Sequence, residues 1–335
     1  MSIYRCNSCF YLGECSLGSE ITEISCPRCG NPTKIYDTII FTQKIIDGYL
    51  ALKRDIQIMK QESLEKPVKD ENAAQINEQN ILSDIDFHST DILANEEQHE
   101  PLRKWFVQRN INPEFNYSAV DMSGYFDEAA QEIGKHYDVL RDTLGKIGWA
   151  YRKNHTGINL DLTSMPQKNG QIINGICRQL YTHTLFSKYF YQKHEKNVHL
   201  GLQSATATKQ FFNGGWLEWY ALGVILKEIS QQGREYIFSC ARNVDIQFAD
   251  GDRHELDIVL YPKRQIPIII ECKSGEFRHE IEKYVRLQKR LKLPAGHFLI
   301  LVTEVNSDQA DALSSMYGLH FVSLNDLKKS LLKII

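Results

Sequence analysis

The fold of the C-terminal part of the chain is decided by one stretch, which reads Arg253-His-Glu-Leu-Asp257-Ile-Val-Leu-Tyr-Pro-Lys-Arg-Gln-Ile-Pro-Ile-Ile-Ile-Glu271-Cys-Lys273-Ser-Gly275. It predicts two strands, at 254–261 and 267–273, with a turn between them. Because side chains alternate along a strand, Glu271 and Lys273 point to the same face. Charged groups at the end of a buried apolar run are costly unless they are paired or bind metal. The pattern therefore indicates a functional site.

The sequence on both sides of this stretch predicts the rest of an α/β domain. A helix is expected at 215–231, followed by a strand at 236–248 that turns through Ala249-Asp-Gly-Asp252 into the next strand. Beyond Lys273 we expect a helix at 277–291, a strand at 297–303, a helix at 307–317, a strand at 319–322 and a helix at 324–332. The order is αβββαβ followed by αβα, which makes residues 206–335 an α/β domain.

Hydrolysis of a phosphodiester accounts for the polar residues of this stretch. Asp257 and Glu271 can hold a hard divalent cation such as Mg²⁺ or Mn²⁺, with waters and a phosphate oxygen completing its shell. The carbonyl of Cys272 is a further candidate ligand, because its side chain points away from that of Glu271. Lys273 can orient the attacking water or neutralise negative charge in the transition state.

A further acid is expected from the preceding helix, in Asn213-Gly-Gly-Trp-Leu-Glu218-Trp-Tyr. Glu218 lies one turn into that helix, among aromatic and apolar neighbours. Its structural alternative is a first-turn glutamate that is stabilised by the helix dipole. Cys177, Cys240 and Cys272 are scattered along the sequence, and their side chains are expected to be small buried apolar groups.

Together, Gly-Gly-Trp-Leu-Glu218, Glu-Leu-Asp257 and Ile-Glu271-Cys-Lys273 resemble the motifs of the PD-(D/E)XK nuclease superfamily, whose core is also αβββαβ. More closely, they resemble the nuclease domain of CRISPR-ancillary and related antiviral effectors. The resemblance covers residues 206–335 and implies metal-dependent cleavage of DNA, with RNA as an alternative, by Glu218, Asp257, Glu271 and Lys273. Leu256 stands where the superfamily often has proline. Those effectors carry an N-terminal Rossmann domain that senses cyclic nucleotides, and this chain has other modules in its place.

The helix expected at 277–291 is rich in charge, with basic residues at Arg278, Lys283, Arg286, Lys289 and Arg290 and, just after it, Lys292. Its position after the motif makes it a candidate for contacting substrate phosphates. An ordinary solvated amphipathic helix fits the same pattern equally well. Gln288 lies where the superfamily often has an auxiliary polar residue.

The N-terminus carries two Cys-x-x-Cys pairs, Cys6-Asn-Ser-Cys9 and Cys26-Pro-Arg-Cys29. Two thiolates on one tight turn can reach a single ion, and two such turns complete a tetrahedron around Zn²⁺. Residues 1–36 resemble a zinc ribbon, in which Gly30 suits a left-handed backbone position. A domain this small usually needs a bound metal ion or disulfides for stability, so the zinc is expected to be structural. Cys15 is an additional thiol that could replace one ligand.

Residues 37–62 predict a helix with a heptad-like seam at Ile45, Tyr49, Leu52, Ile56 and Met59. The seam suggests a homodimeric coiled coil, and packing within its own domain is the alternative. Residues 61–100 contain eleven Asp or Glu against two Lys, a composition that does not bury enough apolar surface to fold alone. We therefore expect an acidic linker at 63–100.

Residues 101–205 are more basic and aromatic, and they are expected to form a mainly helical domain, with helical periodicity at 125–150 and 172–193. Residues 181–194 interleave aromatic and basic side chains. Such a face can stack bases and hold phosphates, and it can equally be a helix with one aromatic core side.

Composition sets limits on the location and partners of the whole chain. No run of about 18 apolar residues predicts a membrane span, and the first residues do not resemble a signal peptide, so we expect a cytoplasmic protein. The net charge of −3 does not mark a nucleic-acid binder by itself. The leading hypothesis is a DNA endonuclease in defence against foreign nucleic acid. The alternatives are a non-catalytic nucleic-acid-binding adaptor, a zinc-ribbon interaction protein or an RNA-cleaving effector.

Overall fold

The computed structural model describes residues 2–5, 12–15, 23–37, 96–116, 125–232, 237–262 and 266–334. They fall into two separate units, Met1–Ala73 and Ala74–Ile335. The predicted heptad seam, most of the acidic linker, Cys6 and Cys9 lie outside the described residues. No described helix is long and apolar enough to cross a membrane.

Unit 1 is a small antiparallel sheet of four short strands in the order β2-β1-β4-β3. The strands are β1 (Ser2–Arg5), β2 (Leu12–Cys15), β3 (Glu23–Ser25) and β4 (Pro32–Asp37). Cys26 to Cys29 form the turn between β3 and β4, where the Gly30 amide donates a 2.8 Å hydrogen bond to the Cys26 carbonyl. Gly30 has φ +74°, the left-handed conformation that its sequence context predicts.

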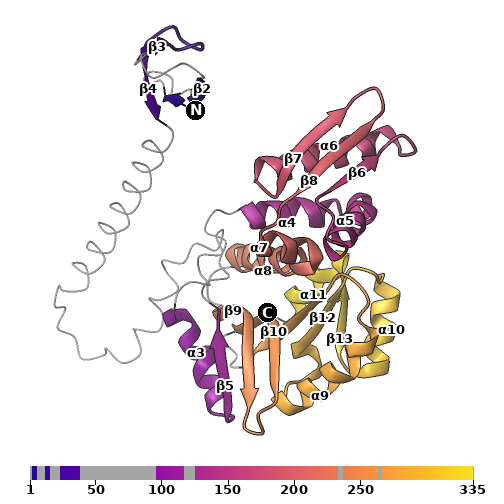
Figure 1. Cartoon of the computed structure of the whole chain (residues 1–335). Coiled ribbons are helices and arrows are strands. Elements are labelled where there is room, and N and C mark those ends of the chain that lie inside the picture. Colours follow the sequence, from indigo (N-terminus) through magenta and orange to yellow (C-terminus); the bar gives the residue numbers. More distant parts are fainter. Residues whose placement is uncertain are drawn as a thin grey trace, which may run out of the picture. The chain divides into compact units, whose positions relative to one another are not determined.

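Unit 2 is built on a six-stranded mixed sheet in the order β13-β12-β11-β10-β9-β5 (Figure 1). β9 (Ile237–Phe248), β10 (Arg253–Pro262) and β11 (Ile268–Lys273) are antiparallel neighbours, whereas β11, β12 (Phe298–Val302) and β13 (His320–Ser323) are parallel. Helix α8 (Trp216–Gln232) precedes β9, and α9 (Ile281–Leu291) connects β11 to β12. The predicted order αβββαβ and the α/β class are therefore confirmed.

Two apolar cores cover the faces of this sheet. One core joins Ile258, Leu260 and Ile270 of the sheet to α8 and to α11 (Leu327–Ile334). The other joins Leu256, Val259 and Ile269 to α3 (Glu96–Val107), α9 and α10 (Ser307–Tyr317). Burial on both faces explains why β12 reads as five consecutive apolar residues.

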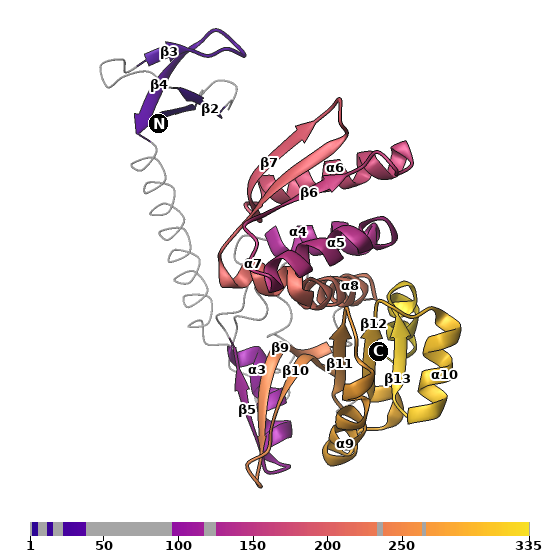
Figure 2. The same ribbon diagram turned by 45° about the vertical axis from the view of Figure 1, so that its right-hand side comes forward.

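A second layer lies beyond α8 (Figures 1 and 2). It contains α4 (Tyr125–Lys135), α5 (Tyr137–Arg152) and α6 (Gln167–Thr182), with a three-stranded sheet in the order β6-β8-β7. The strands are β6 (Gly157–Asp161), β7 (Phe186–Gln192) and β8 (Asn197–Leu202). The short α7 (Thr206–Gln210) returns the chain to α8.

The region at 101–205, which was expected to be mainly helical, contains strands β5, β6, β7 and β8 besides its helices. Helix α3 begins at Glu96, inside the expected linker, and β5 (Ile111–Phe115) pairs with β9 as the edge of the large sheet. The helix expected to reach residue 193 ends at Thr182, and β7 follows. Thr184, with φ +60°, lies in the turn between them. Bulky aromatic residues fit a pleated strand as well as a helix face, so periodicity alone does not separate the two.

Candidate active site

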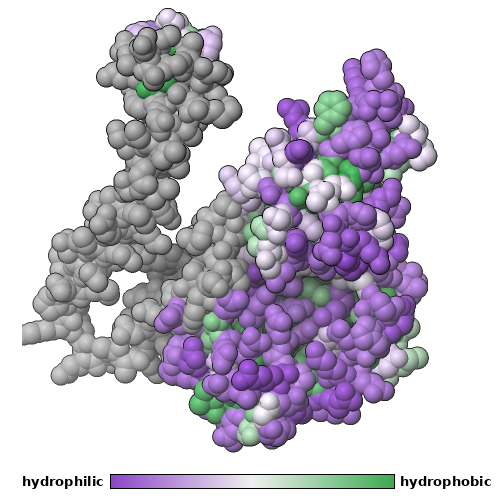
Figure 3. Space-filling view, viewed as in Figure 1, coloured by the Kyte–Doolittle hydropathy of each residue, from purple (hydrophilic) through white to green (hydrophobic). Residues whose placement is uncertain are grey.

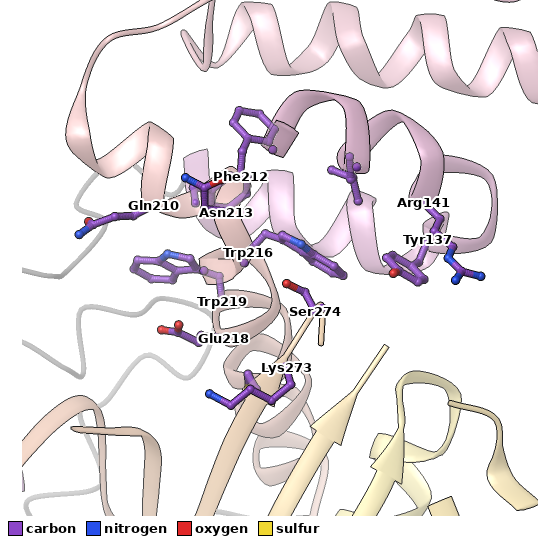
Figure 4. Close-up of a pocket in the computed structure, with 18 of the residues that line it drawn as sticks. Tyr137, Arg141, Gln210, Phe212, Asn213, Trp216, Glu218, Trp219, Lys273 and Ser274 are labelled. Atoms are coloured by element: carbon purple, nitrogen blue, oxygen red, sulfur yellow. The ribbon is translucent and has the colours of Figure 1, made fainter. Parts of the chain in front are cut away.

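A cavity of about 1560 Å³ lies between α5 and the edge of the large sheet where β11 ends. We call this cavity the cleft; it is lined by α5, by the turn before α8, and by Asp257 and Lys273 of the sheet. The visible surface around it is mostly hydrophilic (Figure 3). In Figure 4, Glu218 of α8 and Lys273 of β11 point into the same space.

Lys273 is the centre of a cluster of acidic groups. Its Nζ lies 3.8 Å from Asp257 Oδ2, 3.6 Å from Glu271 Oε2 and 3.6 Å from Glu280 Oε2. Burial alone would lower the pKa of Lys273, but the Asp257 and Glu271 carboxylates raise it above its ordinary value. The ammonium group therefore remains protonated beside the carboxylates, and three of the four predicted site residues are in direct contact.

Glu271 lies beneath Lys273 rather than in the cleft lining. It is only 2% exposed, and its Oε1 is buried without a hydrogen-bond partner among the described residues. Burial, followed by the negative charge of Asp257, raises the pKa of Glu271 to about 8. A buried carboxylate with one unsatisfied oxygen is costly unless a cation or a proton donor is supplied.

Glu218 reaches the cleft because the helix before it is irregular. Phe211–Gly215 form a kink between α7 and α8, in which Gly214 has the non-helical φ of +134°. The Glu218 carboxylate lies 3.4 Å from Arg242 Nη1, and the Arg242 guanidinium stacks 3.7 Å from the centre of the Trp219 ring. Burial, and then repulsion from Asp257, raises the pKa of Glu218 to about 7.

Asp257 lies at the point in β10 where the regular alternation of side chains between the two faces of the sheet is interrupted. Leu256 and Val259 both belong to the α9 side of the sheet, while Ile258 belongs to the α8 side. In strict alternation Leu256 and Ile258 would face the same side. The change lets Asp257 approach Glu218 on one side and Lys273 on the other, and its Oδ2 accepts a 2.7 Å hydrogen bond from the Cys272 amide. Burial raises the pKa of Asp257, while Lys273 opposes that shift.

Sequence reasoning missed two groups of residues at this site. Glu280 and Tyr284 come from the turn before α9 and from α9 itself, and the Tyr284 hydroxyl donates a hydrogen bond to Glu280. Asn243 of β9 lines the cleft with φ +52°, and its Oδ1 is buried without a partner in the described residues. The spacing of the cleft-lining motifs gives no signal for either group, because α9 and β9 contribute them through packing.

The remaining candidates lie near the site without entering it. Gln288 is buried on α9 one turn after Tyr284 and is not among the residues that line the cleft. Arg290 pairs with Asp250 and Asp252 at the tip of the β9–β10 hairpin, and Arg286 pairs with Glu282. Cys272 lines the cleft. Lys283 is exposed, and its positive charge acts to lower the pKa of Glu271.

Comparison with known proteins gives a similarity of fold. No protein-family model matches the chain, and no curated protein matches its sequence. Among solved structures, Can2 from Sulfobacillus thermosulfidooxidans, in complex with cyclic tetra-adenylate, matches with a TM-score of 0.50 at 16% identity, over 69% of this chain and 59% of that one. Protein VC1899 from Vibrio cholerae matches with a TM-score of 0.48 at 18% identity, over 70% and 60%. The chain thus spans about three fifths of each and shares the fold of Can2.

Proposed function

We propose that unit 2 is a metal-dependent nuclease of the PD-(D/E)XK kind that hydrolyses DNA, or RNA as the alternative substrate, in defence against foreign nucleic acid. The observation that carries the proposal is the contact of Lys273 with both Asp257 and Glu271 at the edge of a cleft that also contains Glu218. Paired acids with a lysine in a concave, half-polar site are the groups that phosphodiester hydrolysis needs. The similarity in fold to Can2 is consistent with this proposal.

The acidic residues fit a divalent cation. Glu271 has a buried oxygen without a partner, and the pKa values of Glu218 and Glu271 are raised by burial and by neighbouring negative charge. The described residues contain no group of three His, Cys, Asp or Glu side chains arranged to enclose an ion. Mg²⁺ is usually held by one or two carboxylates together with water and substrate phosphate, so Asp257 and Glu271 are sufficient as protein ligands.

Each residue then has a distinct task. A cation held by Asp257 and Glu271 would polarise the phosphate and lower the pKa of a bound water. The ammonium group of Lys273 offsets negative charge that develops on the phosphoryl oxygens. Glu218, with its pKa raised to about 7, can exchange a proton near neutral pH. Tyr284 and Glu280 hold Lys273 from the α9 side.

The test is cleavage of plasmid, linear duplex, single-stranded DNA and RNA by the full chain with Mg²⁺, Mn²⁺ or EDTA. We expect cleavage with either cation and none with EDTA. Binding of nucleic acid without cleavage in any of these conditions would contradict the proposal and favour an adaptor role.

A further inference from the structure

Helix α5 presents an unusual face to the cleft. Arg141, Gly145, Gly148 and Arg152 follow spacings of four, three and four, which places them on one side of the helix, and all four line the cleft. Glycine is the least favourable residue in a helix interior after proline, so two glycines in one helix call for a reason other than helix stability.

The two glycines act differently. A Cβ on Gly148 would lie 3.2 Å from Arg152 Nη1 and 3.5 Å from the Phe212 carbonyl oxygen, so the Arg152 guanidinium lies over this glycine. A Cβ on Gly145 would have no atom of the described residues within 4 Å. Gly145 is therefore not needed for packing against the part of the chain that the structure describes, and it leaves that part of the cleft wall without a side chain.

Trp149, one turn beyond Gly145, also lines the cleft and is 50% exposed. The other three tryptophans, Trp105, Trp216 and Trp219, are at most 5% exposed. The indole stacks on His155 with ring centres 4.8 Å apart and planes 25° apart, and this contact holds its orientation. Half of the indole surface is therefore open to the cleft, where a ligand can cover it.

Positive charge lies on both sides of this ring. Lys146 and Arg152 precede and follow Trp149 by three residues on α5, and both line the cleft. Within the described part of the chain neither forms an ion pair, whereas Arg141 is paired with Glu304. An exposed aromatic ring between two available cations is the arrangement that holds a nucleobase and its flanking phosphates.

We propose that Trp149, Lys146 and Arg152 form a substrate subsite in which one unpaired nucleobase stacks on the free surface of the indole. The inference rests on the proposed function, because the strand that occupies the subsite is the one cut at Asp257 and Glu271. The base must be unpaired at that position, since a base inside a duplex has both faces covered by its neighbours. Gly145 leaves room for that base beside the ring.

The first experiment measures binding of the full chain to an oligonucleotide containing 2-aminopurine, in EDTA so that no cleavage occurs. We expect Trp149→Ala to weaken binding about tenfold, because stacking of a base on an aromatic ring contributes on this scale. Trp149→Phe should recover most of the affinity. Phe190→Ala is the matched control, since Phe190 is 62% exposed on β7 and does not line the cleft.

The second experiment separates binding from folding. Gly145→Leu places a side chain in the open space beside Trp149, and it replaces glycine in a helix by a better helix former. We expect this variant to have an equal or higher Tm and yet to bind the oligonucleotide more weakly. Lower affinity together with unchanged or increased stability does not arise from misfolding.

The outcomes distinguish the subsite from the nuclease. Cleavage by the wild-type chain, with Trp149→Ala and Gly145→Leu binding as tightly as wild type, would overturn the subsite and leave the nuclease standing. Weaker binding by both variants, with no cleavage by the wild-type chain in any cation, would support the subsite and overturn the nuclease.

Discussion

Asn243 lies directly across the β9–β10 ladder from Asp257, between the pairs Val244–Leu256 and Arg242–Ile258. Asn243 has φ +52°, a left-handed conformation in the middle of a strand of twelve residues. The alternation of side chains between the two faces of the sheet is interrupted in β10 at Asp257, so the two irregularities lie opposite each other. Asparagine tolerates this conformation better than most residues, and such strain is typical of functional sites.

The conformation of Asn243 predicts opposite results for two substitutions. Asn243→Gly preserves the left-handed backbone, so the free energy of unfolding should change little. Asn243→Val should lower it by about 1–2 kcal/mol, because a β-branched side chain strongly disfavours positive φ. Cleavage should fall further in the valine variant, since Asp257 is displaced. Urea unfolding and cleavage rates on both variants provide the check; equal stability of the two would contradict it.

Removing the acidic residues should abolish cleavage. Asp257→Ala or Glu271→Ala removes a proposed cation ligand and should lower the rate by at least about 100-fold, the usual scale for one electrostatic group. Lys273→Ala should also disable cleavage while metal binding persists. Glu218→Ala should be milder, because this residue lies across the cleft from Lys273.

The control for these substitutions is Glu282→Ala, at a glutamate on α9 that is 85% exposed and outside the cleft lining. Turnover and gel shift are measured on the same folded proteins. Wild-type rates in the Asp257 and Glu271 variants would rule out the mechanism, whereas parallel loss of binding and thermal stability would point to a damaged fold.

Unit 1 should contain about one zinc ion per chain, by the ligand count of two Cys-x-x-Cys turns. Cys26 and Cys29 lie at the turn between β3 and β4, and the Asn31 side-chain amide donates to Cys29 Sγ at 3.6 Å. Elemental analysis of protein never exposed to chelator measures the content. Replacing Cys26 and Cys29 should unfold unit 1 and leave cleavage by unit 2 intact; full zinc content in that variant would contradict the assignment.

The seam from Ile45 to Met59 predicts a homodimer, since heptad positions bury apolar side chains between two helices. Light scattering at micromolar concentration should give twice the mass of the 38.7 kDa chain. Ile56→Asp would place a charge in the seam and should yield monomers. A monomeric wild-type mass refutes the coiled-coil interpretation.

His99 predicts an acid-sensitive contact between α3 and the sheet edge. Its ring stacks on Phe115 of β5 at 4.7 Å, and burial lowers its pKa from 6.5 to about 4. Between those values the unfolded chain binds more protons than the folded one, so stability falls as the pH drops from 6.5 towards 4. At pH 5 the loss is about 2 kcal/mol relative to neutral pH. Urea unfolding at pH 7 and pH 5 should show a smaller loss in His99→Leu than in wild type.

Much of unit 2 could be predicted from local pattern. The isoleucine run before Glu271 and the hairpin signal at Asp250-Gly251 specify adjacent strands, and α10 occupies 307–317 as expected. The closeness of Lys273 and Glu271 follows from strand alternation, and antiparallel pairing places β10, which carries Asp257, beside β11. The strands at 111–115 and 186–192 could not be recognised, because their aromatic and apolar residues are compatible with either a strand or a helix face.

The sequence by itself singled out Asp257, Glu271 and Lys273 as candidates, since two acids and a lysine at the ends of buried strands are costly there unless they bind one another or a ligand. Only the tertiary structure decided how these residues are divided between the two sides of the site. Glu271 and Lys273 face α9, where Glu280 and Tyr284 join them, while Glu218 approaches from α8 across the cleft. That division depends on the left-handed turn at Asn243 and on the packing of two helices on opposite faces of one sheet. Both are long-range effects that alternation along a single strand does not encode.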